Sequence, residues 1–286
     1  MPDLRLLVAE SEPPPARAKR RASVGMSQGE TYLDVLARLA PNARADLVRP
    51  VDGDLPGVGA LSNYDAVFLT GSPVHLQDST PEVTRLIDFM RTLFDSGVPS
   101  FGSCAGLQLA VVAAGGELRR MGNRREAGFS RGIAPTAAGR EHPLLAGRPP
   151  AFDAPAIYTD EVVRLPEGAT ALAANNVSPV LAAEVRHGRG VFWGVQYHPE
   201  LSLFEVAAAI RRQSSDLLER GFAADEAALE AHAARIEALG EAPDRHDLAW
   251  QLGLDAEVTD PARRARELSN FLEHVRARVL AGRVDA

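Results

Sequence analysis

The sequence is poor in cysteine and in aromatic residues. It holds one cysteine among 286 residues, and aromatic side chains make up 6%. A single cysteine excludes an internal disulfide and a cysteine-rich metal site. No apolar run approaches the ~20 residues that a membrane-spanning helix needs. The stretch after Leu4–Ala9 turns acidic and proline-rich too early for a secretory signal peptide, so we expect a cytoplasmic protein with no membrane contact.

Positive charge is also in short supply. Lys and Arg number 31 against 38 Asp and Glu, which gives a net charge of −7. An acidic chain lacks the general electrostatic footprint of a nucleic-acid-binding protein. The 45% hydrophobic content is that of an ordinary globular protein. The acidic charge balance therefore predicts no nucleic-acid partner. The histidines show no metal-ligand spacing, so we predict no metal. We also predict no cofactor.

The order of apolar segments indicates an α/β protein. Short apolar runs alternate with amphipathic segments over the first two thirds of the chain, and Leu4–Ala9, Ala66–Thr70 and Val98–Phe101 are predicted strands. Thr80 is a predicted helix cap with Pro81 at the first helical position. Residues 204–286 are rich in Ala, Leu, Glu and Arg and contain no convincing strand.

A basic run, Arg17–Arg21, follows a cluster of three prolines. This pattern predicts a solvated loop, and the alternative is a site that docks a phosphate or an acidic partner.

The lone cysteine lies in the segment Gly102–Gly106 (GSCAG), between a predicted strand and a predicted helix. Small residues on both sides let the backbone turn tightly and expose the thiol, as in a nucleophile elbow with cysteine in place of serine. The positive end of the following helix favours the thiolate. The alternative is that Cys104 is a buried small hydrophobe.

A histidine and a glutamate follow the last predicted strand, in Gly194–Glu200 (GVQYHPE). A cysteine nucleophile needs a base, and the base needs an acceptor that orients it. His198 can take the proton of Cys104, and Glu200 can hold the other imidazole nitrogen. Alternatively, the two residues only flank a proline that ends the strand.

A third segment, Leu69–Pro73 (LTGSP), also lies at the carboxyl end of a predicted strand. Active sites of parallel α/β sheets gather at that edge. The backbone N–H groups of Gly71 and Ala105 are therefore candidate oxyanion donors. The alternative is a plain turn, but three such segments at three strand ends favour one shared site.

Together these segments resemble the class I glutamine amidotransferase family, the type with a Cys-His-Glu triad. The family's pattern Gly-x-Cys-x-Gly-x-Gln is met at residues 102–108, and Gly-x-Gln-x-His-Pro-Glu is met at 194–200. The Thr-Gly-Ser-Pro loop is most similar to that of stand-alone members related to the glutaminase domain of GMP synthase. The resemblance covers roughly residues 1–205. We predict a flavodoxin-like three-layer α/β/α domain with a mostly parallel sheet over 1–204.

The resemblance also implies a reaction. Cys104 would attack the side-chain amide of L-glutamine and expel ammonia, and a water activated by His198 would hydrolyse the γ-glutamyl thioester. Gly71 and Ala105 would stabilise the oxyanion, at about 3–4 kcal/mol per donor in comparable sites. Gln108, by its motif position, would help to hold the substrate.

The substrate loop departs from the family's pattern. Many relatives read Ser-His-Gly-Asp where this chain reads IYTD at residues 157–160. Relatives grip the ends of the substrate with backbone groups there, so Ile157 and Tyr158 are expected to bind substrate. Tyr158 in place of histidine weakens the expectation of strict glutamine preference.

No synthetase sequence follows Glu200: the remaining 86 residues contain neither a pyrophosphatase loop nor a Walker-type phosphate loop. Three hypotheses stay open. The chain is either a glutaminase that passes ammonia to a separate synthetase subunit, or a free-standing hydrolase of γ-glutamyl peptides or amines, or a non-catalytic binding protein on the same scaffold. We predict an α-helical extension over 205–286 that packs on the main domain, and a partner or homo-oligomer interface on it is the alternative.

Overall fold

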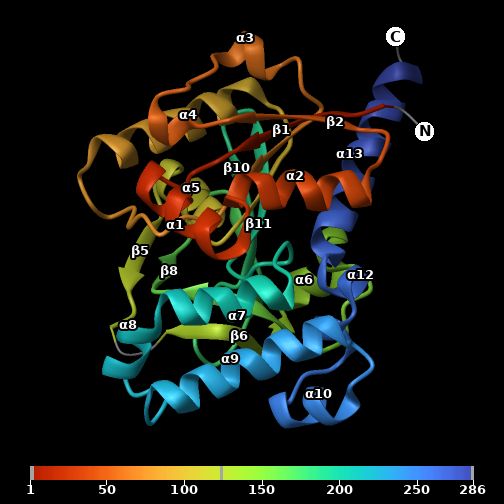
Figure 1. Cartoon of the computed structure of the whole chain (residues 1–286). Coiled ribbons are helices and arrows are strands. Elements are labelled where there is room, and N and C mark those ends of the chain that lie inside the picture. The colour runs from red at the N-terminus through yellow and green to blue at the C-terminus, as the bar shows by residue number, and fades with distance from the viewer. Residues whose placement is uncertain (1–2, 123–124, 285–286) are drawn as a thin grey trace.

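A nine-stranded sheet organises the computed structural model, which describes residues 3–122 and 125–284 (Figure 1). The outer ends of the two predicted domains therefore lie outside the described residues. Five neighbouring strands pair in parallel, and four more continue the sheet in antiparallel pairing. In spatial order they are β2 (Arg44–Val48), β1 (Arg5–Ala9), β3 (Ala66–Leu69), β4 (Ser100–Ser103), β11 (Gly190–Val195), β10 (Ala182–His187), β9 (Ala169–Ala174), β6 (Glu126–Pro135) and β7 (Phe152–Tyr158).

The remaining elements are a small sheet and the helices. Strand β5 (Glu117–Arg120) pairs antiparallel with β8 (Asp160–Arg164). The helices are α1 (Pro14–Val24), α2 (Gln28–Leu39), α3 (Val58–Leu61), α4 (Pro81–Ser96), α5 (Ala105–Ala113), α6 (Ala137–Glu141), α7 (Leu203–Arg212), α8 (Ser214–Glu219), α9 (Glu226–Glu241), α10 (His246–Leu252), α11 (Ala256–Thr259), α12 (Pro261–Arg264) and α13 (Arg266–Val284), with short 3₁₀ turns at Pro50–Asp52 and Pro143–Leu145.

Alternate residues of the parallel strands lie on opposite faces of the sheet, and helices cover both faces. Leu6 and Val8 of β1 pack in one apolar cluster with side chains of α2 and α13, whereas Leu7 and Ala9 pack in a second cluster with α4 and α5. This alternation is what the period of a β-strand requires when both faces are covered. The predicted three-layer α/β/α fold class is confirmed.

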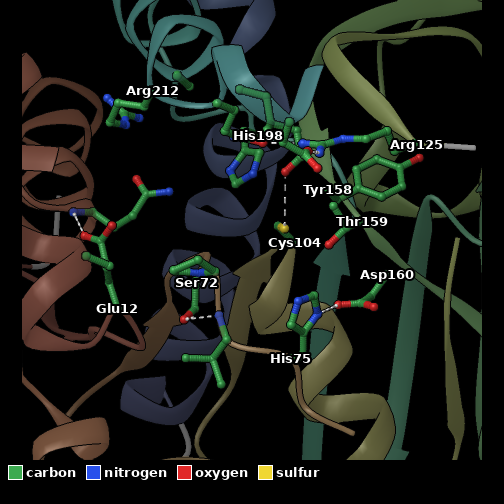
Figure 2. Close-up of a pocket in the computed structure, with 18 of the residues that line it drawn as sticks. Glu12, Ser72, His75, Cys104, Arg125, Tyr158, Thr159, Asp160, His198 and Arg212 are labelled. Carbon is green, nitrogen blue, oxygen red and sulfur yellow. Dashed lines mark hydrogen bonds and ion pairs between the residues drawn. The ribbon is translucent and has the colours of Figure 1, made fainter. Parts of the chain in front are cut away.

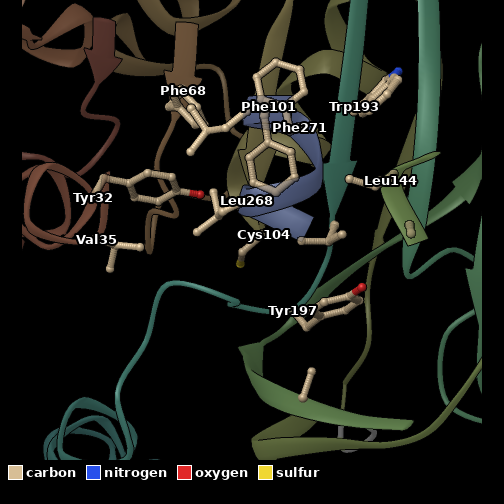
Figure 3. Packing of buried hydrophobic residues seen from close by; sticks show 14 of the residues in the cluster. Tyr32, Val35, Phe68, Phe101, Cys104, Leu144, Trp193, Tyr197, Leu268 and Phe271 are labelled. Carbon is tan, nitrogen blue, oxygen red and sulfur yellow. The ribbon is translucent and has the colours of Figure 1, made fainter. Parts of the chain in front are cut away.

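The C-terminal helix α13 contributes to one of these layers. Its Phe271 ring lies 5.4 Å from the Phe68 ring of β3 and 5.7 Å from the Trp193 ring of β11, measured between centroids (Figure 3). Leu268, Leu272 and Val275 are buried in the same cluster. The division of the chain at 204/205 stays a prediction, but α13, which lies within the predicted extension, packs directly on the sheet.

The prediction of a loop over Arg17–Arg21 is wrong, because these residues lie in helix α1. Prolines are tolerated in the first turn of a helix, where their missing N–H would have no intrahelical partner. Gly25 ends the helix at a φ of 79°. Arg17 and Arg20 are buried, and carboxylates neutralise both: Arg17 pairs with Asp52 at 2.5 Å, and Arg20 with Glu205 at 2.6 Å.

Within 3–122 and 125–284, no helix combines the length and the apolar character that a membrane span would need.

Candidate active site

Cys104 lies at a sharp turn between β4 and α5. Its φ is 52° and its ψ is −109°, which makes it the single non-glycine residue with positive φ among those described. Its backbone N–H donates to the Val195 carbonyl at the end of β11, at 2.8 Å. A Cβ on Gly106 would lie 2.8 Å from the Leu69 carbonyl oxygen of β3. Glycine at this position therefore lets the ends of three parallel strands converge on the thiol.

His198 and Glu200 form a buried pair beside this turn. The Nδ1 atom of His198 lies 2.6 Å from Oε1 of Glu200, and His198 lines the same cavity as Cys104 (Figure 2). Burial alone would lower the pKa of His198, but the charges of Glu200 and Cys104 outweigh burial and raise this pKa to about 10. A raised pKa favours the imidazolium, the form that presents a cation to the sulfur.

A chain of two hydroxyl groups, whose role the motifs did not reveal, leads to Glu200. The Ser103 hydroxyl donates to Oε1 of Glu200 at 3.0 Å, and the Tyr32 hydroxyl lies 2.7 Å from the Ser103 oxygen. Burial, followed by the charge of Glu200, raises the pKa of Tyr32 well above its usual value, so the phenol keeps its proton. Ser103 lies inside the cysteine motif, but Tyr32 is 71 residues away from it and carries no sequence signal.

Gly71 lies against the side chains of Cys104 and His198. A Cβ placed on it would lie 2.8 Å from Cε1 of His198 and 3.7 Å from Cβ of Cys104. Any side chain at this position would therefore displace the imidazole. Ala105 is the first residue of α5, where backbone N–H groups have no intrahelical acceptor. The two expected oxyanion donors thus flank Cys104, and their role stays a proposal.

The expected substrate-binding residues also reach the site. The Ile157 carbonyl oxygen lies 4.0 Å from the Cys104 sulfur. The Tyr158 hydroxyl lies 3.1 Å from that of Ser178, so this side chain is anchored in the wall. Gln108 lines the cavity, but its amide NH₂ already donates to the Asp160 carbonyl at 2.8 Å and to Gln196 at 3.2 Å. The amide oxygen of Gln108 is therefore the atom that is left to contact a substrate directly.

These residues surround a cavity of about 560 Å³. Sequence reasoning missed several residues of its wall. His75 and Asp160 form a pair at 2.6 Å on one side, and charged residues of α1, α7 and α8 line another. Their positions in the chain form no motif, because they come together only through the fold. Among the described residues, no group of three or more His, Cys, Asp or Glu side chains is placed to hold a metal ion.

Residues 36–214 match the model of the family described as glutamine amidotransferase class-I. The chain is 37% identical over 224 residues to a γ-glutamyl-L-1-hydroxyisopropylamide hydrolase of a Pseudomonas species, an alignment that covers 77% of this chain and 76% of the relative. It is 29% identical over 179 residues to a glutamine-hydrolysing GMP synthase subunit of Methanococcus maripaludis, covering 63% of this chain and 82% of that one. Other GMP synthases are matched over 27% and 37% of their length.

The fold has close counterparts among solved structures. A glutamine amidotransferase of Thermotoga maritima superimposes with a TM-score of 0.65 over 96% of this chain and 99% of that chain, at 16% identity. This likeness concerns the fold, while the sequence match identifies the family. The chain belongs to the class I glutamine amidotransferase family.

Proposed function

We propose that this protein hydrolyses the γ-glutamyl amide bond of glutamine or of a related γ-glutamyl compound through a thioester on Cys104. One observation carries the proposal. A cysteine on a strained turn shares a cavity with an imidazole that a buried glutamate holds at 2.6 Å. That arrangement is a nucleophile with a base and an orienting acceptor, which are the parts that acyl transfer needs.

The first half of the reaction forms the thioester. The Cys104 sulfur, stabilised as thiolate by the facing imidazolium, attacks the γ-carbonyl carbon. The carbon–nitrogen bond breaks, and the His198 imidazolium gives its proton to the leaving nitrogen. In the second half, neutral His198 takes a proton from water, the water oxygen bonds to the carbonyl carbon, and the carbon–sulfur bond breaks. The products are glutamate and ammonia or an amine.

Backbone groups around Cys104 complete the mechanism. The N–H groups of Gly71 and Ala105 stabilise the tetrahedral oxyanion, each contributing about 3–4 kcal/mol to the transition state. Glu200 keeps His198 in the orientation that serves both proton transfers, with Ser103 and Tyr32 as positioning residues. Gln108, Ile157 and Tyr158 hold the glutamyl part of the substrate at the cavity wall.

Glutamine is the leading substrate, and the acceptor of its ammonia is a separate synthetase. The family match supports this assignment, as does the likeness to the GMP synthase subunit of Methanococcus maripaludis. A second candidate is a free-standing hydrolase of γ-glutamyl amines or peptides. The 37% identical relative, named as a γ-glutamyl hydroxyisopropylamide hydrolase, favours that candidate. A cavity of about 560 Å³ also leaves room for a leaving group larger than ammonia.

A release assay on the purified chain tests the proposal. Glutamine and a panel of γ-glutamyl amines and dipeptides are compared for release of ammonia or amine, with Cys104→Ala as the blank. We expect Cys104→Ala to lose at least about 10⁴-fold in turnover, with an unchanged melting temperature. Preferred release of an amine or amino acid identifies a free-standing hydrolase.

The silent outcomes are separated by labelling. No release, together with labelling of Cys104 by a glutamine-like diazoketone, identifies a glutaminase that waits for its synthetase. No release and no labelling contradicts the proposal and leaves the non-catalytic scaffold. Location in the cytoplasm and independence from cofactors stay predictions.

A further inference from the structure

The cavity extends from the reaction centre in two directions. One arm, which we call the α1–α7 arm, is lined by Glu12, Lys19, Arg20, Gln28 and Arg212. The opposite side is lined by residues 157–160, and Figure 2 shows Glu12 and Arg212 on one side of His198 with Tyr158, Thr159 and Asp160 on the other. In Figure 2 His198 stands between Cys104 and Arg212, so a leaving nitrogen that receives the His198 proton would point into the α1–α7 arm.

The arginines of the cavity wall differ in whether a carboxylate pairs with them. Four of them lie within 4 Å of a carboxylate: Arg20 with Glu205, Arg120 with Asp78, and both Arg125 and Arg220 with Asp216. Arg212 has no carboxylate within that distance among the described residues. Its guanidinium donates instead to the Ser23 hydroxyl, at 2.7 Å. Arg212 is thus the cavity arginine whose charge the described chain leaves without an ion-pair partner.

The surroundings of Arg212 make this lack of a partner costly. Arg212 is half-buried, and burial together with the charge of nearby Arg20 lowers its pKa to about 10. Lys19 adds a further positive charge, with its ammonium 3.5 Å from the Arg212 carbonyl oxygen. Glu12 is the one carboxylate that lines the arm, and it accepts from the backbone N–H of Gln28 at 3.2 Å. Glu205 neutralises Arg20, so Glu12 is the carboxylate of the arm that is left to balance Arg212 and the exposed Lys19, and an anion beside Arg212 would complete the arm.

We propose that the α1–α7 arm is the leaving-group subsite and that Arg212 binds a carboxylate carried by the leaving group. The preferred substrates are then γ-glutamyl amino acids and peptides rather than neutral or cationic γ-glutamyl amines. This inference rests on the proposed function, and within it on the second candidate, a free-standing hydrolase of γ-glutamyl amines or peptides. The chemistry is the same: water is consumed, the γ-carbonyl–nitrogen bond breaks, and the nitrogen leaves with the His198 proton as the amine of an amino acid.

Three substrates of matched size test the inference on the full chain. They carry glycine, glycinamide and ethylenediamine on the γ-carboxyl group, so that the leaving groups are anionic, neutral and cationic. We expect kcat/KM to be about 10- to 100-fold higher for γ-glutamylglycine than for the glycinamide, the effect of a charge-assisted hydrogen bond. Equal rates, or a preference for the neutral or cationic leaving group, would overturn the inference. A preference for a hydroxyalkyl amine, the chemistry in the name of the 37% identical relative, would overturn it as well.

A neighbouring arginine supplies the control. Arg212→Met should abolish the preference for γ-glutamylglycine over the glycinamide. Arg211→Met should keep it, because Arg211 pairs with Glu230 and Glu237 at 2.8 Å on α9 and lies outside the cavity wall. Equal loss of the preference in both variants would indicate damage to α7 and contradict the assignment to Arg212.

A binding measurement separates this inference from the proposed function. Cys104→Ala is titrated calorimetrically with γ-glutamylglycine and with the glycinamide, alone and combined with Arg212→Met. Tighter binding of γ-glutamylglycine that disappears with Arg212→Met supports the subsite even in a chain that waits for a synthetase. Equal binding of the two ligands, or no binding of either, overturns the subsite whatever glutamine turnover shows.

Discussion

The two sides of the cavity are built in different ways. At the proposed reaction centre, Cys104, Gly71 and the His198–Glu200 pair lie at the ends of parallel strands, and backbone geometry fixes their positions. In the α1–α7 arm, charged side chains on helices meet through contacts between residues far apart in the chain. Arg20 and Glu205, for example, are 185 positions apart.

This difference suits two separate tasks: the strand ends would carry out the reaction, and the α1–α7 arm would select the substrate. In the proposed reaction, the reacting groups need close backbone approach, which a few glycines and one strained residue enforce within a short segment. In the proposed subsite, the leaving group meets side chains that the fold assembles from separate elements, where one substitution changes charge without touching Cys104. Relatives can therefore share the reaction centre and still differ in the compound they cleave.

The largest effect is expected at the reaction centre. Glu200→Gln removes the charge that holds the His198 imidazolium and should lower kcat by about 10³- to 10⁴-fold, as loss of the orienting carboxylate does in related triads. Amine-release kinetics measure the loss, and the melting temperature checks the fold. A loss below tenfold would show that Glu200 is a structural residue.

Within the α1–α7 arm, the buried Arg20–Glu205 ion pair should act mainly on stability. Arg20→Met breaks a buried ion pair and leaves Glu205 uncompensated, so it should lower the free energy of unfolding by about 3–5 kcal/mol. The matched control is Arg21→Met on the same helix, whose pair with Glu30 is much more exposed and should cost about 0–1 kcal/mol. Denaturant unfolding of both variants measures this contrast. Equal costs would mean that α1 is not anchored through Arg20.

The pH dependence of catalysis sharpens the account of the histidine. Glu200 raises the pKa of His198, so removing its charge must lower that pKa. The imidazolium donates the proton to the leaving nitrogen, and the alkaline limb of kcat/KM should therefore move from about pH 10 to lower pH in Glu200→Gln. A shift of at least about one pH unit is expected. An unmoved limb would assign the titration to another group.

A smaller effect is expected one hydrogen bond further out. Ser103→Ala removes the hydroxyl that donates to Glu200 and should lower kcat about tenfold. It should leave KM nearly unchanged, since Ser103 does not line the cavity. Tyr32→Phe, which spares the bond between Ser103 and Glu200, should cost less. The reverse order would show that Tyr32 acts through packing rather than through Ser103.

The parts that could be predicted from the sequence are the local ones. The turn at Cys104, the ends of β3 at Leu69 and of β11 at Val195, and the helix cap at Thr80 each depend on residues within one short segment. The strand before Cys104 is predicted two residues too early, at Val98–Phe101, whereas β4 spans Ser100–Ser103. The last two residues of β4 are a glycine and a serine, which lack the apolar pattern of a strand although both are buried.

The parts that the sequence could not reveal depend on long-range contacts. Arg17–Arg21 has the composition of a solvated loop, and the carboxylates of Asp52 and Glu205, at distant positions, help to make a buried helix face from it. Tyr32 reaches Ser103 across 71 residues, and Arg212 joins the cavity wall only because α7 packs beside α1. No local pattern of apolar or charged residues records such pairings.

The central claim, a γ-glutamyl thioester on Cys104, is tested most directly by trapping that intermediate. The full chain is mixed with its best γ-glutamyl amide substrate, quenched in acid during turnover, digested and analysed by mass spectrometry. We predict one γ-glutamyl group on the peptide that contains Cys104, and none in Cys104→Ala. A γ-glutamyl group on a different residue, or undiminished hydrolysis by Cys104→Ala, would contradict the account.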